Sequence, residues 1–168
     1  MNNQTSYRQK TVQLTQAAII AALYIVLTFI ANALGLANFA VQVRFSESLT
    51  ILPYFTKSAI PGLFIGCLLS NILTGCAIPD IVFGSLATLI GSVITYTLRS
   101  HKWAAPIGPI LSNALIIPFV LLYAYGIQPL WFSFVTVTAG EIISCGILGM
   151  LLLLTLEKHS STLFGSAK

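Results

Sequence analysis

Charged residues are scarce in this chain, and their scarcity excludes a water-soluble fold. Only 7% of its 168 residues are Asp, Glu, Lys or Arg, whereas soluble domains average about 25%. The mean hydropathy is +0.92. Because the apolar runs are continuous rather than alternating, they favour membrane helices over a closed barrel. We therefore expect an all-α membrane protein that forms a single integral membrane domain over residues 1–168.

Several signatures of catalysis and metal binding are also missing. The chain has no GxxxxGK[ST] phosphate-binding loop, no HExxH and no GxSxG motif. Its three cysteines, Cys67, Cys76 and Cys145, include no CxxC pair, which favours apolar packing over a disulfide or a metal site. We therefore expect no enzyme and no metal or other cofactor. If ATP drives transport here, another chain must hydrolyse it.

Six apolar segments are long enough, or nearly so, to be membrane helices, since a full span needs about 20 apolar residues. The expected helices cover residues 12–34, 45–55, 59–74, 80–98, 107–123 and 130–156. The second is short, about 16 Å as a helix, and would cross only part of the bilayer. The loop 35–44 is a candidate lid.

The basic residues are distributed unevenly around these segments. An even number of segments puts both chain ends on one side, and seven of the eight basic residues then share that side. They are Arg8, Lys10, Lys57, Arg99, Lys102, Lys158 and Lys168. The positive-inside rule makes this side cytoplasmic, and only Arg44 lies outside. We expect a multi-pass protein of the cell membrane with both termini cytoplasmic. Its net charge of +4 is explained by this topology and by attraction to anionic lipid headgroups, and does not indicate binding of nucleic acid.

Three of the four acidic residues lie in or beside apolar segments. Glu141 is roughly 16 Å into the last helix, whereas Glu47 and Asp80 lie near the outer ends of theirs. An ionised group in hydrocarbon is costly, so it usually faces a bundle interior, a cavity or a ligand. We therefore expect an outward-facing pocket, with Tyr123, Tyr125 and Trp131 near its rim. The candidate substrate-binding residues are Arg44, Glu47, Asn71, Asp80, Asn113 and Glu141.

Structural roles are open for most of these residues. Asp80 at a helix start would complement the helix dipole. Arg44 and Glu47 could form an ion pair, and Asn71 and Asn113 could link helices. Glu141 is the hardest to explain structurally, because nothing at its depth obviously neutralises it.

Small residues mark another surface on the first helix. Ala17, Ala18, Ala21 and Ala22 form two overlapping AxxxA pairs, and the third segment carries a GxxxG pair. Such spacings let helices approach closely. The pattern alone is weak as a sign of partner docking, because any bundle uses it internally.

Longer strings in the chain resemble the QueT family. They are VRFSESLTILP at 43–53, AIPGLFIGC at 59–67 and DIVFGSLATL at 80–89, followed by residues 113–114 and 140–141. The resemblance implies a substrate-binding S component of an energy-coupling factor (ECF) transporter, with a six-helix bundle and one site toward the outside. It also implies that the alanine motif binds a transmembrane coupling subunit. Two cytoplasmic ATPases complete such a transporter complex. Either alanine register is possible, with a slight preference for Ala18 and Ala22.

The expected substrate is a queuosine precursor of the 7-deazaguanine type, which presents adjacent N–H donors. A carboxylate that accepts both donors makes a strong, oriented contact. We expect Glu141 or Asp80 in this role, with Asn71 and Asn113 as orienting partners and Glu47 near any amine. The alternative is a secondary transporter in which Glu141 carries a coupled proton.

Overall fold

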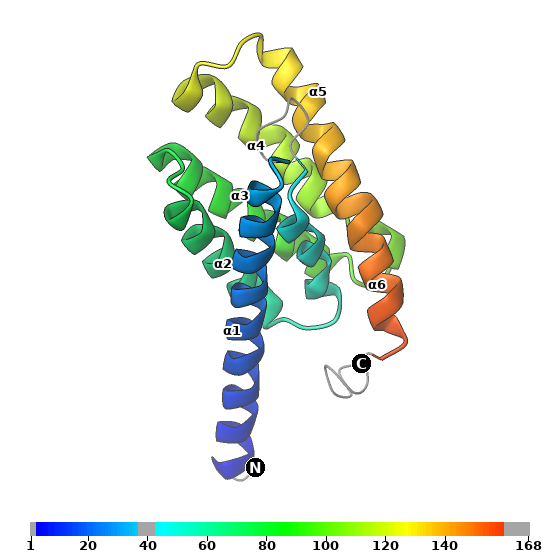
Figure 1. Cartoon of the computed structure of the whole chain (residues 1–168). Coiled ribbons are helices and arrows are strands. Elements are labelled where there is room, and N and C mark those ends of the chain that lie inside the picture. Colours follow the sequence, from blue (N-terminus) through cyan, green and yellow to red (C-terminus); the bar gives the residue numbers. More distant parts are fainter. Residues whose placement is uncertain (1–2, 37–42, 160–168) are drawn as a thin grey trace.

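The structure, a computed structural model, describes residues 3–36 and 43–159, and these residues form helices and connecting turns without a strand (Figure 1). This confirms the expected all-α class. The elements are α1 (Asn3–Ala33), η1 (Phe45–Tyr54), α2 (Ala59–Leu73), α3 (Ile78–Thr97), η2 (Lys102–Ala104), α4 (Ile107–Tyr125), α5 (Leu130–Glu141), η3 (Ile142–Gly149) and α6 (Met150–Glu157). Residues 37–42 of the candidate lid and Lys168 lie outside the described residues.

Apart from α1 and the short η2, the elements begin and end within two residues of the expected segments. α1 begins at Asn3, nine residues before the expected start, because residues 3–11 contain no Gly or Pro to stop a helix. The short second segment is a 3-10 helix, η1, that contains Pro53. The expected last helix is continuous through α5, η3 and α6, and η3 is a π-helical stretch that begins directly after Glu141.

In the part of the chain that the structure describes, four helical stretches are long and apolar enough to cross a membrane. They cover Tyr7–Ala33, Ile78–Thr97, Lys102–Tyr125 and Leu130–Glu157. α2 is apolar but only 15 residues long, and η1 is shorter still. The chain is therefore a multi-pass membrane protein, and these four stretches are its full-length candidate crossings within the described residues.

Glycines allow two pairs of helices to pack with their backbones in contact. A Cβ on Gly62 of α2 would lie 2.6 Å from the carbonyl oxygen of Ala17 in α1. A Cβ on Gly91 of α3 would lie 2.7 Å from the Cα of Pro109 in α4. Both distances are too short for any side chain, so the missing side chains set the helix separation.

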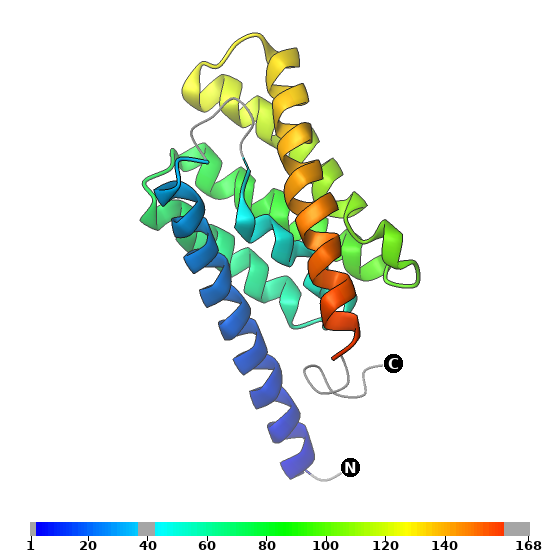
Figure 2. The same ribbon diagram turned by 45° about the vertical axis from the view of Figure 1, so that its right-hand side comes forward.

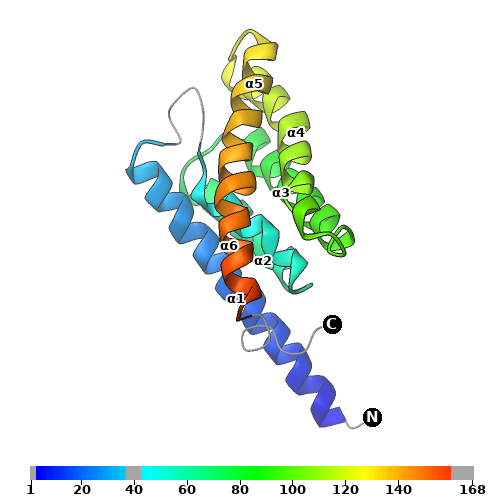
Figure 3. The same ribbon diagram turned by 90° about the vertical axis from the view of Figure 1, so that its right-hand side faces the viewer.

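η1 lies in the middle of the bundle, between α1 and the α5–α6 helix (Figure 2). Its buried residues include Glu47, Thr50 and Ile51. The first turns of α1 project beyond the other helices (Figure 3), and several of their side chains are exposed. The start of α1 and the end of α6 lie at the same end of the bundle.

Candidate functional site

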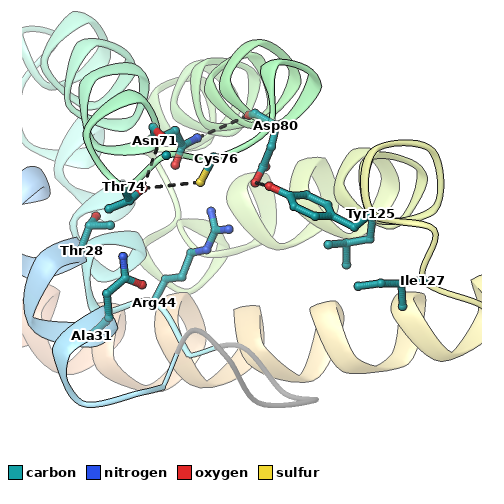
Figure 4. A pocket seen from close by; sticks show the side chains of 12 residues that line it. Thr28, Ala31, Arg44, Asn71, Thr74, Cys76, Asp80, Tyr125 and Ile127 are labelled. Atoms are coloured by element: carbon teal, nitrogen blue, oxygen red, sulfur yellow. Dashed lines mark hydrogen bonds between the residues drawn. The ribbon is translucent and has the colours of Figure 1, made fainter.

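A cavity of about 330 Å³ opens at the end of the bundle opposite the start of α1. It lies where α1, α2 and α4 end and α3 begins, and Arg44 enters it from the segment before η1 (Figure 4). Its lining residues are Thr28, Ala31, Asn32, Arg44, Asn71, Thr74, Gly75, Cys76, Asp80, Leu121, Tyr125 and Ile127. The volume is at the lower end of the range for small-molecule sites, about 300–1,000 Å³.

Asp80 is held in the first turn of α3, directly after Pro79, and only 4% of its surface is exposed. Its Oδ2 accepts a 3.2 Å hydrogen bond from the Tyr125 hydroxyl, which in turn accepts one of 3.0 Å from the backbone N–H of Ala77. Oδ1 is buried and has no hydrogen-bond partner among the described residues. A buried acceptor without a donor costs free energy. A ligand that donates a hydrogen bond to Oδ1 would remove this cost, so the arrangement is typical of a binding site.

Asn71 lies one turn before the end of α2 and faces Asp80. Its Nδ2 is 3.4 Å from the backbone oxygen of Asp80 and 3.7 Å from Sγ of Cys67. A Cβ on Gly84 would lie 3.2 Å from both Nδ2 of Asn71 and Oδ1 of Asp80. The glycine therefore leaves room for the amide and the carboxylate to approach each other.

Arg44 is half-buried and precedes η1, where its backbone N–H donates a 3.2 Å hydrogen bond to Oγ of Ser144. Within residues 3–36 and 43–159, no carboxylate lies within ion-pairing distance of its guanidinium. The ion pair with Glu47 considered from the sequence is therefore not formed. Burial disfavours its charge, but the surrounding acidic groups, Asp80 first among them, together more than offset this and raise the pKa of Arg44 above its ordinary value.

The remaining predicted residues, Glu47, Asn113 and Glu141, form an inner cluster in the core and do not line the cavity. The Tyr24 hydroxyl donates to Oε1 of Glu47, and Nδ2 of Asn113 lies 3.5 Å from Oε2. The thiol of Cys145 donates to Oε2 of Glu141 at 3.1 Å.

The inner cluster brings two acids close together, and neither forms an ion pair with a basic side chain of the described residues. Ligand atoms of Glu47, Glu141 and Cys145 all lie within 4.8 Å of one another, so they could hold a cation. Two buried carboxylates at this distance are compatible only with a shared proton or with a bound positive charge. The sequence indicated neither the pairing of the two acids nor the role of Cys145.

Sequence reasoning thus named both groups but treated them as one pocket. It also placed Tyr125 correctly near the cavity, whereas Tyr123 and Trp131 are exposed elsewhere, at 82% and 66%. Tyr24 was missed, although a tyrosine in the middle of an apolar helix needs a partner for its hydroxyl, and this signal could have found it.

The four alanines of α1 face two directions. Ala17 and Ala21 are buried against α2, where a Cβ on Gly66 would lie 3.0 Å from the Cα of Ala21. Ala18 and Ala22 are exposed on the other side of the helix. One AxxxA pair is therefore used inside the chain, and the other is free of contacts with α2.

Comparisons with known proteins agree on a family. A family described as QueT transporter matches residues 14–158. The queuosine precursor transporter QueT of Lactococcus lactis subsp. cremoris (strain MG1363) is 35% identical over 83 residues, which make up 49% of this chain and 48% of that protein. The alignment thus spans about half the length of this relative. No solved structure matches the chain.

Proposed function

The chain belongs to the QueT transporter family, and we propose that it is the substrate-binding subunit of an ATP-driven ECF uptake transporter for a queuosine precursor. One observation carries this proposal: the cavity combines a buried carboxylate oxygen with a guanidinium, and neither has a bonding or ion-pairing partner within the described residues. A site of this kind suits a small planar solute that has donors and acceptors on one edge. The relative's name supports the queuosine precursor as the solute.

The proposed topology has six crossings, with η1 and α2 as the short ones and both termini in the cytoplasm. The pair between Nζ of Lys102 and Oε2 of Glu157, 3.1 Å apart, supports it, because it joins η2 to the end of α6. η2 lies between the end of α3 and the start of α4, whereas the cavity is lined by the start of α3 and the end of α4. Because the positive-inside rule places the basic end in the cytoplasm, the cavity at the other end would face the outside of the cell.

Six residues are proposed to recognise the ligand, in two layers. Arg44, Asn71 and Asp80 would contact it in the cavity, beside the ring of Tyr125, which offers a face for stacking. Glu47, Asn113 and Glu141 would complete the site from below and favour a ligand that carries a cationic amine. A 7-deazaguanine fits this chemistry, because a carboxylate can accept its two adjacent N–H donors.

The partner surface is proposed to be the exposed pair Ala18 and Ala22. Their small side chains permit a helix of a transmembrane coupling subunit to approach α1 closely. Ala17 and Ala21 would contribute indirectly, because they hold α1 against α2. Two cytoplasmic ATPases on the coupling subunit would supply the energy, and membrane lipid would cover the remaining apolar surface.

A binding titration tests the proposal. Purified full-length protein in lipid nanodiscs is titrated with 7-deazaguanines, guanine and common vitamins, and saturable binding of the deazaguanines alone is expected. Uptake into proteoliposomes should then require the coupling subunit, the ATPases and ATP. Saturable binding of a vitamin in place of the deazaguanines would contradict the proposal.

The proximity of Glu47 and Glu141 favours one alternative, a proton-coupled secondary transporter that uses Glu141 as the proton carrier. It predicts uptake by this chain alone, without ATPases, and complete loss of uptake when an uncoupler is added. The same proteoliposomes decide between the two mechanisms.

A further inference from the structure

We propose that Asp80 determines specificity by accepting two adjacent N–H donors of the ligand, while Arg44 donates to the carbonyl oxygen beside them. This inference rests on the proposed function and names the residue that selects a guanine-type edge. Asp80 and Arg44 would thus recognise the edge that all 7-deazaguanines share, whichever substituent the five-membered ring carries.

The hydrogen bonds of Asp80 leave room for two further donors. An ionised carboxylate offers about four lone-pair positions. Tyr125 occupies one of them on Oδ2, and Oδ1 has no partner among the described residues. Asp80 is nine-tenths buried and lines the cavity, so a ligand in the cavity can supply the missing donors when the carboxylate turns its buried Oδ1 toward it.

The other two buried acids are less suited to this role. Both oxygens of Glu47 already have donors, from Tyr24 and Asn113. Glu141 accepts from the Cys145 thiol, and neither residue lines the cavity. The sequence offered Glu141 and Asp80 as the carboxylate that accepts the adjacent N–H donors of the ligand. The structure favours Asp80.

Arg44 supplies the complementary half of the pattern. A guanidinium has only donors, and this one projects into the cavity without an ion pair among the described residues (Figure 4). In a guanine-type base, a carbonyl oxygen stands next to the ring N–H, which is followed by the amino group. One carboxylate and one guanidinium therefore match three neighbouring atoms in order, and reject a base whose order differs.

An exchange of ligand preference tests this pattern. Asp80→Asn replaces an acceptor pair by one acceptor and one donor, which complements 7-deazaxanthine, because that base has a carbonyl where 7-deazaguanine has an amino group. Affinity of the variant in nanodiscs is expected to fall roughly tenfold or more for 7-deazaguanine and to rise for 7-deazaxanthine. A gain of binding cannot result from misfolding.

Two controls locate the effect. Glu157→Gln makes the same kind of chemical change at an exposed acid of α6 that does not line the cavity, and should leave the preference for 7-deazaguanine over 7-deazaxanthine unchanged. The wild-type protein should bind 7-deazahypoxanthine, which lacks the amino group, roughly tenfold more weakly than 7-deazaguanine. This measurement requires no variant to fold.

The outcomes separate the inference from the function on which it rests. Equal wild-type affinity for 7-deazaguanine and 7-deazahypoxanthine overturns the inference, as does an unchanged preference in Asp80→Asn or an exchange produced by Glu157→Gln. In each of these cases the proposed function stands. If the wild-type protein binds no deazaguanine at all, the proposed function itself fails.

Discussion

Gly62 of α2 packs directly on the backbone of Ala17 in α1, since a Cβ on Gly62 would lie 2.6 Å from the Ala17 carbonyl oxygen. Gly66 makes the same kind of contact one turn later, with Ala21 and Tyr24. This seam also sets the position of Tyr24, whose hydroxyl bonds to Glu47 in the inner cluster. The close approach of the two helices is thus part of what builds the polar interior.

Gly62→Ala should destabilise the protein by about 1–3 kcal/mol, because the added methyl group meets backbone atoms that cannot move independently. Thermal unfolding of the purified protein in detergent measures the effect as a lower Tm. Gly146→Ala is the matched control, since the nearest atom to its Cβ would be 3.7 Å away. Equal Tm values for the two variants would disprove the proposed role of the seam.

The double variant Ala18→Trp with Ala22→Trp should abolish co-purification with the coupling subunit and leave ligand binding intact, because both side chains are exposed and make no seam with α2. Pull-down from membranes that contain all subunits measures assembly, and a titration measures ligand binding. Leu115→Trp places the same bulk on an exposed position of α4 and should leave assembly unchanged. Normal assembly of the double variant would exclude this face of α1.

The choice between the two alanine registers illustrates what the sequence could and could not predict. The AxxxA spacing is visible in the sequence, but both registers satisfy it, and only the contact with Gly62 and Gly66 shows which pair is used internally. Helix positions, in contrast, followed from continuous apolar runs, and the missed start of α1 followed from judging helix length by hydropathy alone.

The candidate site was predictable to a similar degree. Topology alone placed Arg44, Asn71 and Asp80 at one end of the bundle, because helix ends meet there, and all three line the cavity. Depth along the helix also indicated that Glu141 lies deeper. Sequence spacing does not show which way a side chain points around the helix axis, so the pairing of Glu141 with Glu47 could not be predicted.

Tyr125→Phe should weaken binding of 7-deazaguanine by roughly threefold to tenfold, which corresponds to the loss of one hydrogen bond. The hydroxyl orients the carboxylate of Asp80 and ties it to the backbone of Ala77. Without it, Asp80 is free to rotate and must be ordered when the ligand binds. The measurement is a titration of the purified variant in nanodiscs.

Tyr123→Phe is the matched control for this prediction. Tyr123 lies two residues earlier on α4, but its side chain is 82% exposed and it does not line the cavity. Its variant should bind the ligand like the wild-type protein. Unchanged affinity in Tyr125→Phe would mean that Asp80 is held by other contacts.

Tyr24→Phe should destabilise the folded protein by about 1–3 kcal/mol, because it removes the donor to Oε1 of Glu47 and leaves a buried acceptor unsatisfied. Since Tyr24 and Glu47 share this bond, Glu47→Gln should change the cost of Tyr24→Phe. A double-mutant cycle on unfolding free energies in detergent should give a coupling energy of about 0.5–3 kcal/mol.

Thr155→Val serves as the control in the same cycle, because Thr155 is exposed and bonds only locally, to the backbone of Leu151. Its effect on stability should add to that of Glu47→Gln without coupling, as expected for residues that share no partner. If Tyr24→Phe and Glu47→Gln are additive as well, the tyrosine does not hold the carboxylate. Among the described residues, the inner cluster would then depend on Asn113 and Cys145, the other two side-chain donors within hydrogen-bonding reach of its acids.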